Sequence, residues 1–253
     1  MCRVIAISNH KGGVGKTTSV VNIGAGLARE GRKVLLVDLD PQANMTISFG
    51  IQEAERTIYH ALKGESGIEI YNISKNIDIV ASTLDLSGAE SELASEAGRE
   101  YILQELLAPF EEKYDYIIID CPPSLGLLTI NAFTAVSEVF IPLQPHYLAI
   151  KGLSKIIEVI NKIKRRLNKK IEITGVFVTQ FDKRKVLHRD VLETIKTYFG
   201  DRVFYTKIRE NIALAEAPSS GTNIFDYDKE SNGAEDYARL VREIMAMEEK
   251  KNG

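Results

Sequence analysis

Hydrophobic residues along the chain fall into two alternating patterns. Short runs of β-branched and other aliphatic residues are mostly unbroken by polar positions, which is typical of strands covered on both faces. Between these runs, apolar residues recur every three or four positions, as over residues 153–168, where lysine and glutamate occupy the opposite helix face. The runs that predict strands are 4–7, 34–37, 77–80, 116–119, 139–141 and 173–178.

This alternation of strand and helix predicts the fold class. Strands joined by helices form βαβ units, and such units build a mostly parallel sheet with helices on both faces. The helix after the first strand should end near Arg29, because its charged last turn is followed by Gly31, which suits the left-handed C′ position. Since no linker or internal repeat interrupts the pattern, we expect a single doubly wound α/β domain over residues 1–253, with no helix-turn-helix domain ahead of the first strand.

Composition excludes several classes of protein. Of the 253 residues, 44% are hydrophobic and 26% are charged, and no stretch approaches the roughly 18–20 apolar residues of a membrane span. The N-terminal segment lacks the features of a secretory signal, and the two cysteines, Cys2 and Cys121, exclude a disulfide framework and a CxxC motif. We therefore expect a cytoplasmic protein. Because the net charge is −3, any contact with nucleic acid must come from a local basic patch.

A glycine-rich segment follows the first predicted strand. Residues 10–18 read HKGGVGKTT, a variant of the common phosphate loop with His10 in place of the first glycine and an additional lysine, Lys11. Glycines let backbone N–H groups wrap phosphate oxygens, and the following helix directs its positive end toward them. In such a loop Lys16 places a positive charge at the β- and γ-phosphates, and the Thr17 hydroxyl ligates Mg²⁺. The predicted nucleotide-binding residues are Lys11, Gly12, Gly13, Val14, Gly15, Lys16, Thr17 and Thr18.

Acidic residues follow two further predicted strands. In open α/β sheets, ligands bind in the crevice outside the carboxyl ends of parallel strands. Asp120 comes at the end of the apolar run 116–119 and has the form of a carboxylate that holds Mg²⁺ through water. Asp40 follows the run 34–37 and is placed to orient an attacking water and to contact the metal through water. A helix N-cap is the alternative role for a single aspartate at a strand end.

Five segments together give the chain a family resemblance. They are 11–18, 38–46 (DLDPQANMT), 120–131 (DCPPSLGLLTIN), 179–184 (TQFDKR) and 211–221 (NIALAEAPSSG). The chain resembles the deviant-Walker ATPases, and among them the ParA/Soj ATPases that partition plasmids and chromosomes. The resemblance implies a P-loop NTPase fold, ATP and Mg²⁺ as cofactors, and weak intrinsic hydrolysis of ATP to ADP and phosphate.

The resemblance also implies roles for individual residues. Lys11 becomes the signature lysine that reaches the nucleotide of the other subunit, so that ATP joins a sandwich homodimer. Lys16 contacts the phosphates and Asp40 orients the hydrolytic water, which completes the catalytic set with Lys11. Thr17 and Asp120 hold the metal, and Asn211 frames the adenine. The ATP-bound dimer is expected to bind double-stranded DNA non-specifically on the nucleoid, and a ParB-type centromere-binding protein is expected to stimulate hydrolysis and release.

Two basic clusters are candidates for contact with DNA. One spans residues 162–170, with Lys164 and Arg166, and the other contains Lys183 and Arg184. Arg184 matches a position that the family uses on its DNA-binding surface, whereas Ala213 stands where relatives often carry an arginine. A solvated helix face is the alternative interpretation of each cluster.

Three other functions compete with DNA partitioning. A MinD-like membrane-associated positioning ATPase would end in a basic amphipathic helix, but residues 234–253 are rich in acidic side chains and predict a packing helix. An iron–sulfur reductase would need two cysteines on one side of the subunit, whereas Cys121 is expected to be a buried core residue. A nucleotide-binding regulator without turnover would not need Asp40.

Overall fold

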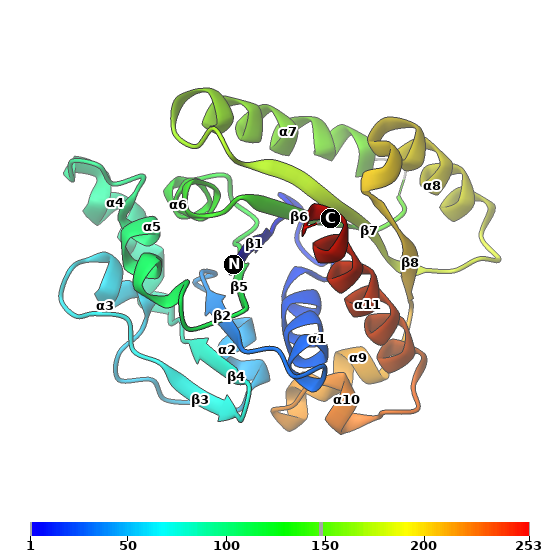
Figure 1. Ribbon diagram of the computed structural model, residues 1–253, viewed down its shortest axis with the longest axis horizontal. Coiled ribbons are helices and arrows are strands. Elements are labelled where there is room, and N and C mark those ends of the chain that lie inside the picture. Colours follow the sequence, from blue (N-terminus) through cyan, green and yellow to red (C-terminus); the bar gives the residue numbers. More distant parts are fainter. Residues whose placement is uncertain (1, 147–148, 253) are drawn as a thin grey trace.

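Eight strands form one sheet in the part of the chain that the structure describes. The structure is a computed structural model that describes residues 2–146 and 149–252. The strand order is β3-β4-β2-β5-β1-β6-β7-β8, and every neighbouring pair is parallel except β3 and β4 (Figure 1). The mostly parallel α/β sheet predicted from the sequence is therefore confirmed.

All six predicted strands are present, and two more lie at the edges of the sheet. The predicted ones are β1 (Arg3–Ile7), β2 (Val34–Asp38), β4 (Ile77–Val80), β5 (Tyr116–Asp120), β6 (Glu138–Leu143) and β7 (Glu172–Phe181). The strands that were not predicted are β3 (Tyr71–Ser74) and β8 (Val203–Arg209). An edge strand has one neighbour and is only partly covered, so both carry polar residues and lack the unbroken apolar run of a central strand.

Helices cover both faces of the sheet, as predicted. Along β1, Val4 and Ala6 point into a core shared with α5, α6, α7 and α8, whereas Ile5 and Ile7 point into a second core under α1, α10 and α11. The longer helices are α1 (Lys16–Arg29), α6 (Leu127–Ala135), α7 (Ala149–Arg166), α8 (Val186–Phe199) and α11 (Asn232–Asn252). The shorter ones are α2 (Asn44–Ser48), α3 (Ile58–Leu62), α4 (Ala89–Glu92), α5 (Ile102–Leu107), α9 (Ala213–Glu216) and α10 (Ile224–Tyr227).

Local signals in the sequence set two helix ends. Helix α1 ends at Arg29, and Gly31 has a φ of +82°, so the predicted left-handed C′ glycine is confirmed. Helix α7 ends at Arg166 rather than at 168. There the Asn168 side chain donates hydrogen bonds to the carbonyls of Thr134 and Val136, which draws the chain out of the helix and onto the end of α6.

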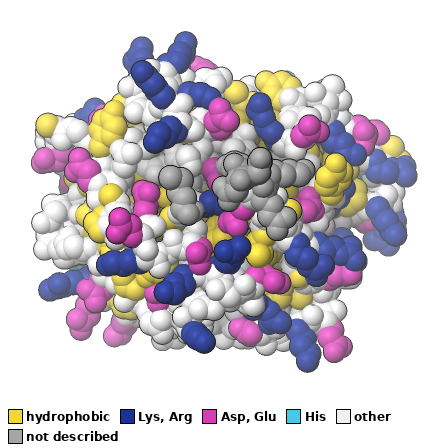
Figure 2. All heavy atoms as spheres, in the orientation of Figure 1, with side chains coloured by type: hydrophobic (Ala, Val, Ile, Leu, Met, Phe, Trp, Pro, Cys, Tyr) yellow, Lys and Arg dark blue, Asp and Glu magenta, His cyan; other side chains and the backbone are white. Residues whose placement is uncertain are grey.

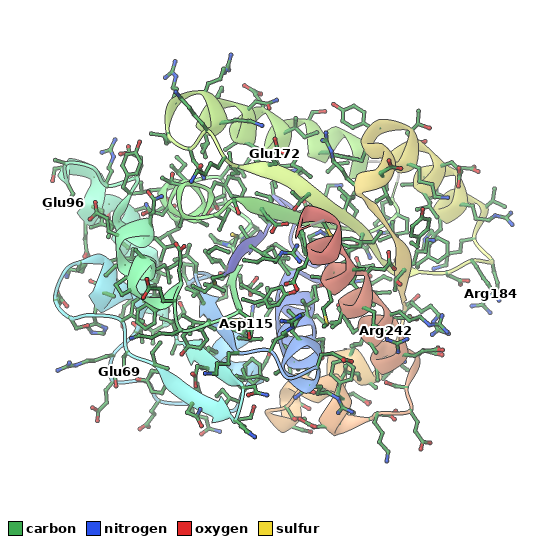
Figure 3. All side chains as sticks on the ribbon, viewed as in Figure 1. Glu69, Glu96, Asp115, Glu172, Arg184 and Arg242 are labelled. Carbon is green, nitrogen blue, oxygen red and sulfur yellow. The ribbon has the colours of Figure 1, made fainter. Side chains whose placement is uncertain are left out.

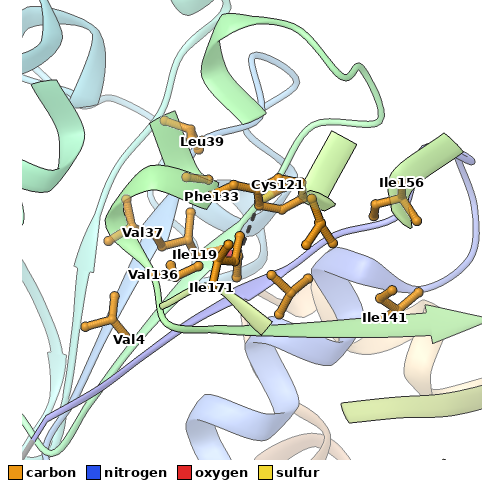
Figure 4. Packing of buried hydrophobic residues seen from close by; sticks show 14 of the residues in the cluster. Val4, Val37, Leu39, Ile119, Cys121, Phe133, Val136, Ile141, Ile156 and Ile171 are labelled. Carbon is orange, nitrogen blue, oxygen red and sulfur yellow. Dashed lines mark hydrogen bonds between the residues drawn. The ribbon is translucent and has the colours of Figure 1, made fainter. Parts of the chain in front are cut away.

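Cysteine positions agree with a structural role and not with a metal cluster. Cys121 is fully buried among hydrophobic side chains beyond the end of β5 (Figure 4). Cys2 lies ahead of β1, and β1 and β5 run parallel with Ile7 opposite Asp120. The two thiols therefore lie at opposite ends of these parallel strands, Cys2 at the amino ends and Cys121 at the carboxyl ends. This separation does not fit the pair of cluster ligands that an iron–sulfur reductase needs.

Carboxylates of α11 protect the exposed edge of the sheet at β8. The Glu243 carboxylate accepts hydrogen bonds from the backbone N–H groups of Tyr205 and Thr206, both at 2.7 Å. Asp236 accepts one from the N–H of Arg209 at 2.9 Å. An unpaired strand edge is a template for pairing with another chain, so these contacts block part of that template.

Helix α11 packs on the body of the protein through its apolar face. Tyr237, Leu240, Val241 and Ile244 are all buried in the core that also contains α1. The packing helix predicted for this part of the chain is therefore present up to Asn252, and Gly253 lies outside the described residues. Among the helices of residues 2–146 and 149–252, none has the length and hydropathy to cross a membrane.

Candidate active site

The predicted phosphate loop connects β1 to α1 at the carboxyl edge of the sheet. Gly13 and Gly15 have φ angles of +71° and +84°, a backbone conformation that side chains with a Cβ rarely adopt. Helix α1 begins at Lys16, and no side chain caps its N-terminus. Its first N–H groups are therefore available to an anion such as phosphate.

Lys16 turns back into the loop beneath these amides. Its side chain is buried, and Nζ donates a hydrogen bond to the Lys11 carbonyl at 3.2 Å. Burial lowers the pKa of Lys16, and the nearby carboxylates of Asp120 and Asp40 oppose that shift. Thus the structure brings Lys16 together with both predicted acidic residues, although they come from three different βα connections.

The tip of β7 supports the phosphate loop from two strands away. The Thr179 hydroxyl donates a hydrogen bond to the Val14 carbonyl at 2.8 Å, and Gln180 Nε2 donates to the Gly13 carbonyl at 3.1 Å. Gln180 itself has a φ of +51°, and such uncommon backbone conformations in non-glycine residues concentrate at functional sites. Segment 179–184 was recognised from the sequence only as a family motif, and its contact with the loop was not predicted.

Asp120 lies at the end of β5, directly between the ends of β1 and β2. It pairs in register with Ile7 on one side and with Asp38 on the other. The carboxylate is fully buried, and neither oxygen makes a hydrogen bond of good geometry with a described residue, although the Thr17 hydroxyl is close enough to lower its pKa. Burial, followed by the charge of Asp38, raises the pKa of Asp120 well above its usual range, against lowering contributions from Thr17 and Lys16.

A buried carboxylate with two unpaired oxygens fits a divalent cation. Mg²⁺ keeps several waters and is typically bound by one or two carboxylates together with substrate phosphates. Within the described residues no group of three or more His, Cys, Asp or Glu side chains could hold a metal, so a dedicated all-protein metal cage is absent from that part of the chain. The residues that would hold Mg²⁺ are Thr17, with Asp120 and Asp40 through water, and the ion would neutralise charge on the phosphates there.

Asp40 is held at the rim of the same crevice. It is 7% exposed, and its Oδ1 accepts a hydrogen bond from the N–H of Gln42 at 3.0 Å. No described residue hydrogen-bonds to its Oδ2. Neighbouring Asp38 is fully buried, which raises its pKa to about 6 against the lowering effect of hydrogen bonds from Thr46 and Asp40. Asp40 therefore keeps one carboxylate oxygen that is available to a water molecule.

A separate pocket adjoins the phosphate loop on the side of β8. Its volume is about 300 Å³, and Gly15, Thr18 and Asn211 are among the residues that line it. The Oδ1 of Asn211 is buried and lacks a hydrogen-bond partner in the part of the chain that the structure describes. Asn211, the residue predicted to frame adenine, thus lines the same pocket as the loop and has a free acceptor for an amino group.

Lys11 lies outside this cradle. Its side chain is half-buried and runs with His10 along the start of α7, where a Cβ on Gly152 would come within 2.3 Å of His10 and 3.3 Å of Lys11. Gly12 and Gly13 beside it are exposed, and a Cβ added to either would meet nothing within 4 Å. Lys11 is therefore next to an open surface of the loop rather than enclosed with Lys16.

The two basic clusters lie at opposite ends of strand β7. Lys164 and Arg166 are at the end of α7, and Lys164 pairs with Glu172 at the start of β7 at 2.7 Å. Arg184 and Lys183 follow the other end of this ten-residue strand. The Arg184 side chain is 85% exposed and forms a double hydrogen bond with Asp182. Figure 2 shows Lys and Arg side chains gathered in both places, and Figure 3 labels Glu172 and Arg184.

Comparisons with known proteins cover nearly the whole chain. A family model described as an AAA domain matches residues 2–173. The chain is 44% identical over 249 residues to the chromosome-partitioning ATPase Soj of Treponema pallidum, which covers 97% of this chain and 98% of that protein. It is 47% identical over 251 residues to the sporulation initiation inhibitor protein Soj of Bacillus subtilis, with 97% and 99% covered. A solved structure of cobyrinic acid a,c-diamide synthase from Mycobacterium smegmatis, with an ATP analogue and magnesium bound, matches with a TM-score of 0.87 and 34% identity over 97% of this chain and 94% of that one.

Proposed function

Because the chain belongs to the Soj/ParA family of chromosome-partitioning ATPases, we propose that it partitions chromosomal or plasmid DNA through ATP-dependent binding to the nucleoid. The protein is an ATPase that uses ATP and Mg²⁺, as its motifs predict.

In the proposed cycle, an ATP-bound homodimer binds double-stranded DNA without sequence preference. A ParB-type centromere-binding protein stimulates hydrolysis, which separates the subunits and releases the DNA. We propose that residues 1–253 act as one cytoplasmic unit in this cycle.

The position of Lys11 supports the homodimer. A lysine is costly to desolvate unless it meets an anion, and the phosphate cradle of this subunit already contains Lys16. Lys11 lies instead beside the exposed glycines of the loop. A second subunit that approaches this edge would offer its nucleotide phosphates to Lys11, so ATP would join two copies face to face.

The topology of the sheet favours Arg184 and Lys183 as the DNA contacts. They follow the end of β7, and that end also supports the phosphate loop through Thr179. A homodimer that closes across the phosphate loops would bring two copies of this cluster to the same region. Lys164 and Arg166 belong to the opposite edge, where two copies would remain far apart, so we assign them a secondary contribution.

DNA binding measured with ATP, with ADP and without nucleotide tests this function. The Asp40→Ala variant is used so that hydrolysis does not deplete ATP, and binding to an arbitrary duplex is followed by fluorescence anisotropy. We expect the protein to bind DNA with ATP but not with ADP or without nucleotide. If six to ten phosphates are contacted, the affinity should fall by a factor of about 10³ to 10⁵ between 50 and 200 mM salt. Binding that ignores the nucleotide would contradict the proposed cycle.

Charge reversal separates the two clusters. Arg184→Glu should abolish DNA binding and retain ATP-dependent dimerisation. Arg166→Glu is the matched control, with the same substitution at an exposed arginine of the other edge, and it should weaken binding by less than fivefold. The reverse result would move the DNA-binding surface to the end of α7 and refute the assignment of Arg184.

A MinD-like membrane function is the alternative. The apolar residues of α11 are buried against the body of the protein and are not presented to a lipid surface. Sedimentation with anionic vesicles should therefore leave the protein in the supernatant both with ATP and with ADP. ATP-dependent recovery with the vesicles would favour the membrane function instead.

A further inference from the structure

Four buried residues beside the candidate active site form a closed ring of hydrogen bonds. The N–H and the hydroxyl of Thr46 donate to Asp38 Oδ2 at 2.8 and 2.7 Å. The hydroxyl oxygen of Thr46 accepts the N–H of Ser82 at 2.9 Å. Ser82 Oγ donates to the Asp40 carbonyl at 2.9 Å, and the N–H of Asp40 donates to Asp38 Oδ1 at 3.2 Å, which closes the ring.

Each hydroxyl in the ring has a specific use. The Thr46 hydroxyl donates a hydrogen bond to Asp38 and accepts one from the N–H of Ser82, so it links the end of β2 to the segment after β4. Thr46 is 3% exposed and Ser82 is 1% exposed, so water has little access to replace a lost bond. A buried polar group that loses its partner stays unsatisfied, and that penalty makes such networks respond strongly to a single substitution.

The ring fixes both backbone polar groups of Asp40. Its N–H is held by Asp38, and its carbonyl accepts from Ser82 Oγ and from the N–H of Ala43 at 2.9 Å. Ala43 has a φ of +52°, so the chain makes a tight, uncommon turn immediately after Asp40. With its backbone held in this way and its Oδ1 accepting the N–H of Gln42, the Asp40 carboxylate is restrained at the rim of the crevice with Oδ2 free.

We propose that Thr46 and Ser82 are positioning residues for ATP hydrolysis and act through Asp40. This inference rests on the proposed role of Asp40 in orienting the attacking water. Neither Thr46 nor Ser82 hydrogen-bonds to the phosphate loop in the described part of the chain. Loss of the ring should therefore slow turnover and leave nucleotide binding unchanged, because displacement of a catalytic group by about 1 Å can cost 10²-fold in rate.

Single-turnover phosphate release and the dissociation constant of a non-hydrolysable ATP analogue together test the proposal in the full chain. Thr46→Val keeps the shape of the side chain and removes its hydroxyl, and it should lower the rate constant at least tenfold with the dissociation constant within twofold. Thr46→Ser restores the hydroxyl and should recover more than half of the rate. Ser48→Ala is the matched control, because Ser48 is equally buried on α2 but donates only to the Asn44 carbonyl at 2.6 Å.

Ser82→Ala provides an independent arm if the valine variant does not fold. It leaves all donors to Asp38 in place and removes only the bond to the Asp40 carbonyl, so the rate constant should fall about threefold to tenfold. If the ring acts as one unit, the Thr46→Val/Ser82→Ala double variant should be no slower than Thr46→Val alone.

The outcomes distinguish this inference from the function on which it rests. Normal turnover in both Thr46→Val and Ser82→Ala, with Asp40→Ala inactive, overturns the positioning role alone. Normal turnover in Asp40→Ala overturns the role of Asp40 and the positioning inference together. Equal losses of rate and of nucleotide affinity would indicate a general structural defect and would also overturn the proposal.

Discussion

The Thr179 hydroxyl at the tip of β7 donates a 2.8 Å hydrogen bond to the Val14 carbonyl, 165 positions earlier in the sequence. Strand β6 lies between β7 and β1, so this contact reaches over a neighbouring strand end to hold the phosphate loop. The loop thus depends on a residue of the segment that also leads to Arg184. The conformation of the loop and the placement of that segment are consequently linked through this side chain and through Gln180, which donates to the Gly13 carbonyl.

Removing this bond should loosen the phosphate loop. Thr179→Val keeps the buried shape and loses the hydroxyl, and a hydrogen bond of this kind is worth about 1 kcal/mol. We expect the affinity for an ATP analogue to fall about fivefold, measured by titration calorimetry. Thr174→Val, the same substitution on the same strand at a distance from the loop, should bind nucleotide normally. Equal affinities for the two variants would show that Thr179 does not support the loop.

Lys11 should be needed for dimerisation and dispensable for nucleotide binding. In the Asp40→Ala background, light scattering should give a dimer with ATP and Mg²⁺ and a monomer with ADP. Adding Lys11→Ala should leave a monomer in both, with nucleotide still bound, because its charge acts on the second subunit. Lys155→Ala, at an exposed lysine of α7 close to His10, should still dimerise. A Lys11→Ala dimer of normal strength would contradict the sandwich arrangement.

Asn211 should contribute to the choice of base. Its buried, unpaired Oδ1 can accept a hydrogen bond from the amino group of adenine, which guanine does not present in the same place. Asn211→Ala should weaken ATP binding about tenfold and reduce the preference for ATP over GTP. Competition between the two nucleotides for a fluorescent analogue measures both quantities. Glu210→Gln, next to it in the same pocket, should retain the preference.

Among the ion pairs that the structure describes, the buried pair between Arg3 and Glu138 should cost the most stability when it is broken. Arg3 Nε is 2.8 Å from Glu138 Oε1, and the two side chains are 9% and 3% exposed. Arg3 also donates a hydrogen bond to the Ile244 carbonyl at 2.7 Å. Arg3→Met leaves the Glu138 charge buried without its arginine, so the free energy of unfolding should fall by about 3–5 kcal/mol in urea. Arg32→Met, which breaks the more exposed pair with Glu248, should cost less than about 1 kcal/mol. Similar losses would mean that burial of the Arg3 pair carries no extra weight.

Local pattern was sufficient for the centre of the sheet and insufficient for its edges. The continuous apolar runs of β1 and β5 exist because both faces are covered, so they can be recognised from the sequence alone. Strand β8 reads VFYTKIR, and its stability depends on β7 and on carboxylates of α11 that lie more than 25 positions away. No local pattern reports contacts of that range.

The candidate site divides in the same way. The meeting of Lys16, Asp40 and Asp120 could be predicted, because a glycine-rich loop marks Lys16 and each aspartate ends or follows a recognisable strand. Parallel strands bring their carboxyl ends to one edge of the sheet. The support from Thr179 and the ring through Thr46 and Ser82 could not be predicted, because they depend on strand order and side-chain direction. Lys164 and Arg184 are only 20 positions apart in the sequence. The intervening strand β7 separates them by its full length, so they lie at opposite ends of the parallel strands.

During synthesis, strand β8 is completed before the carboxylates that cover its edge. Residues 203–209 leave the ribosome before Asp236 and Glu243, so the N–H groups that these acids will occupy are unprotected for several seconds at ordinary rates of translation. During that interval the nascent strand can pair with the same strand of a chain on a neighbouring ribosome. The folding yield of this protein should therefore depend on how promptly α11 docks, and crowded polysomes are where slow docking would be most harmful.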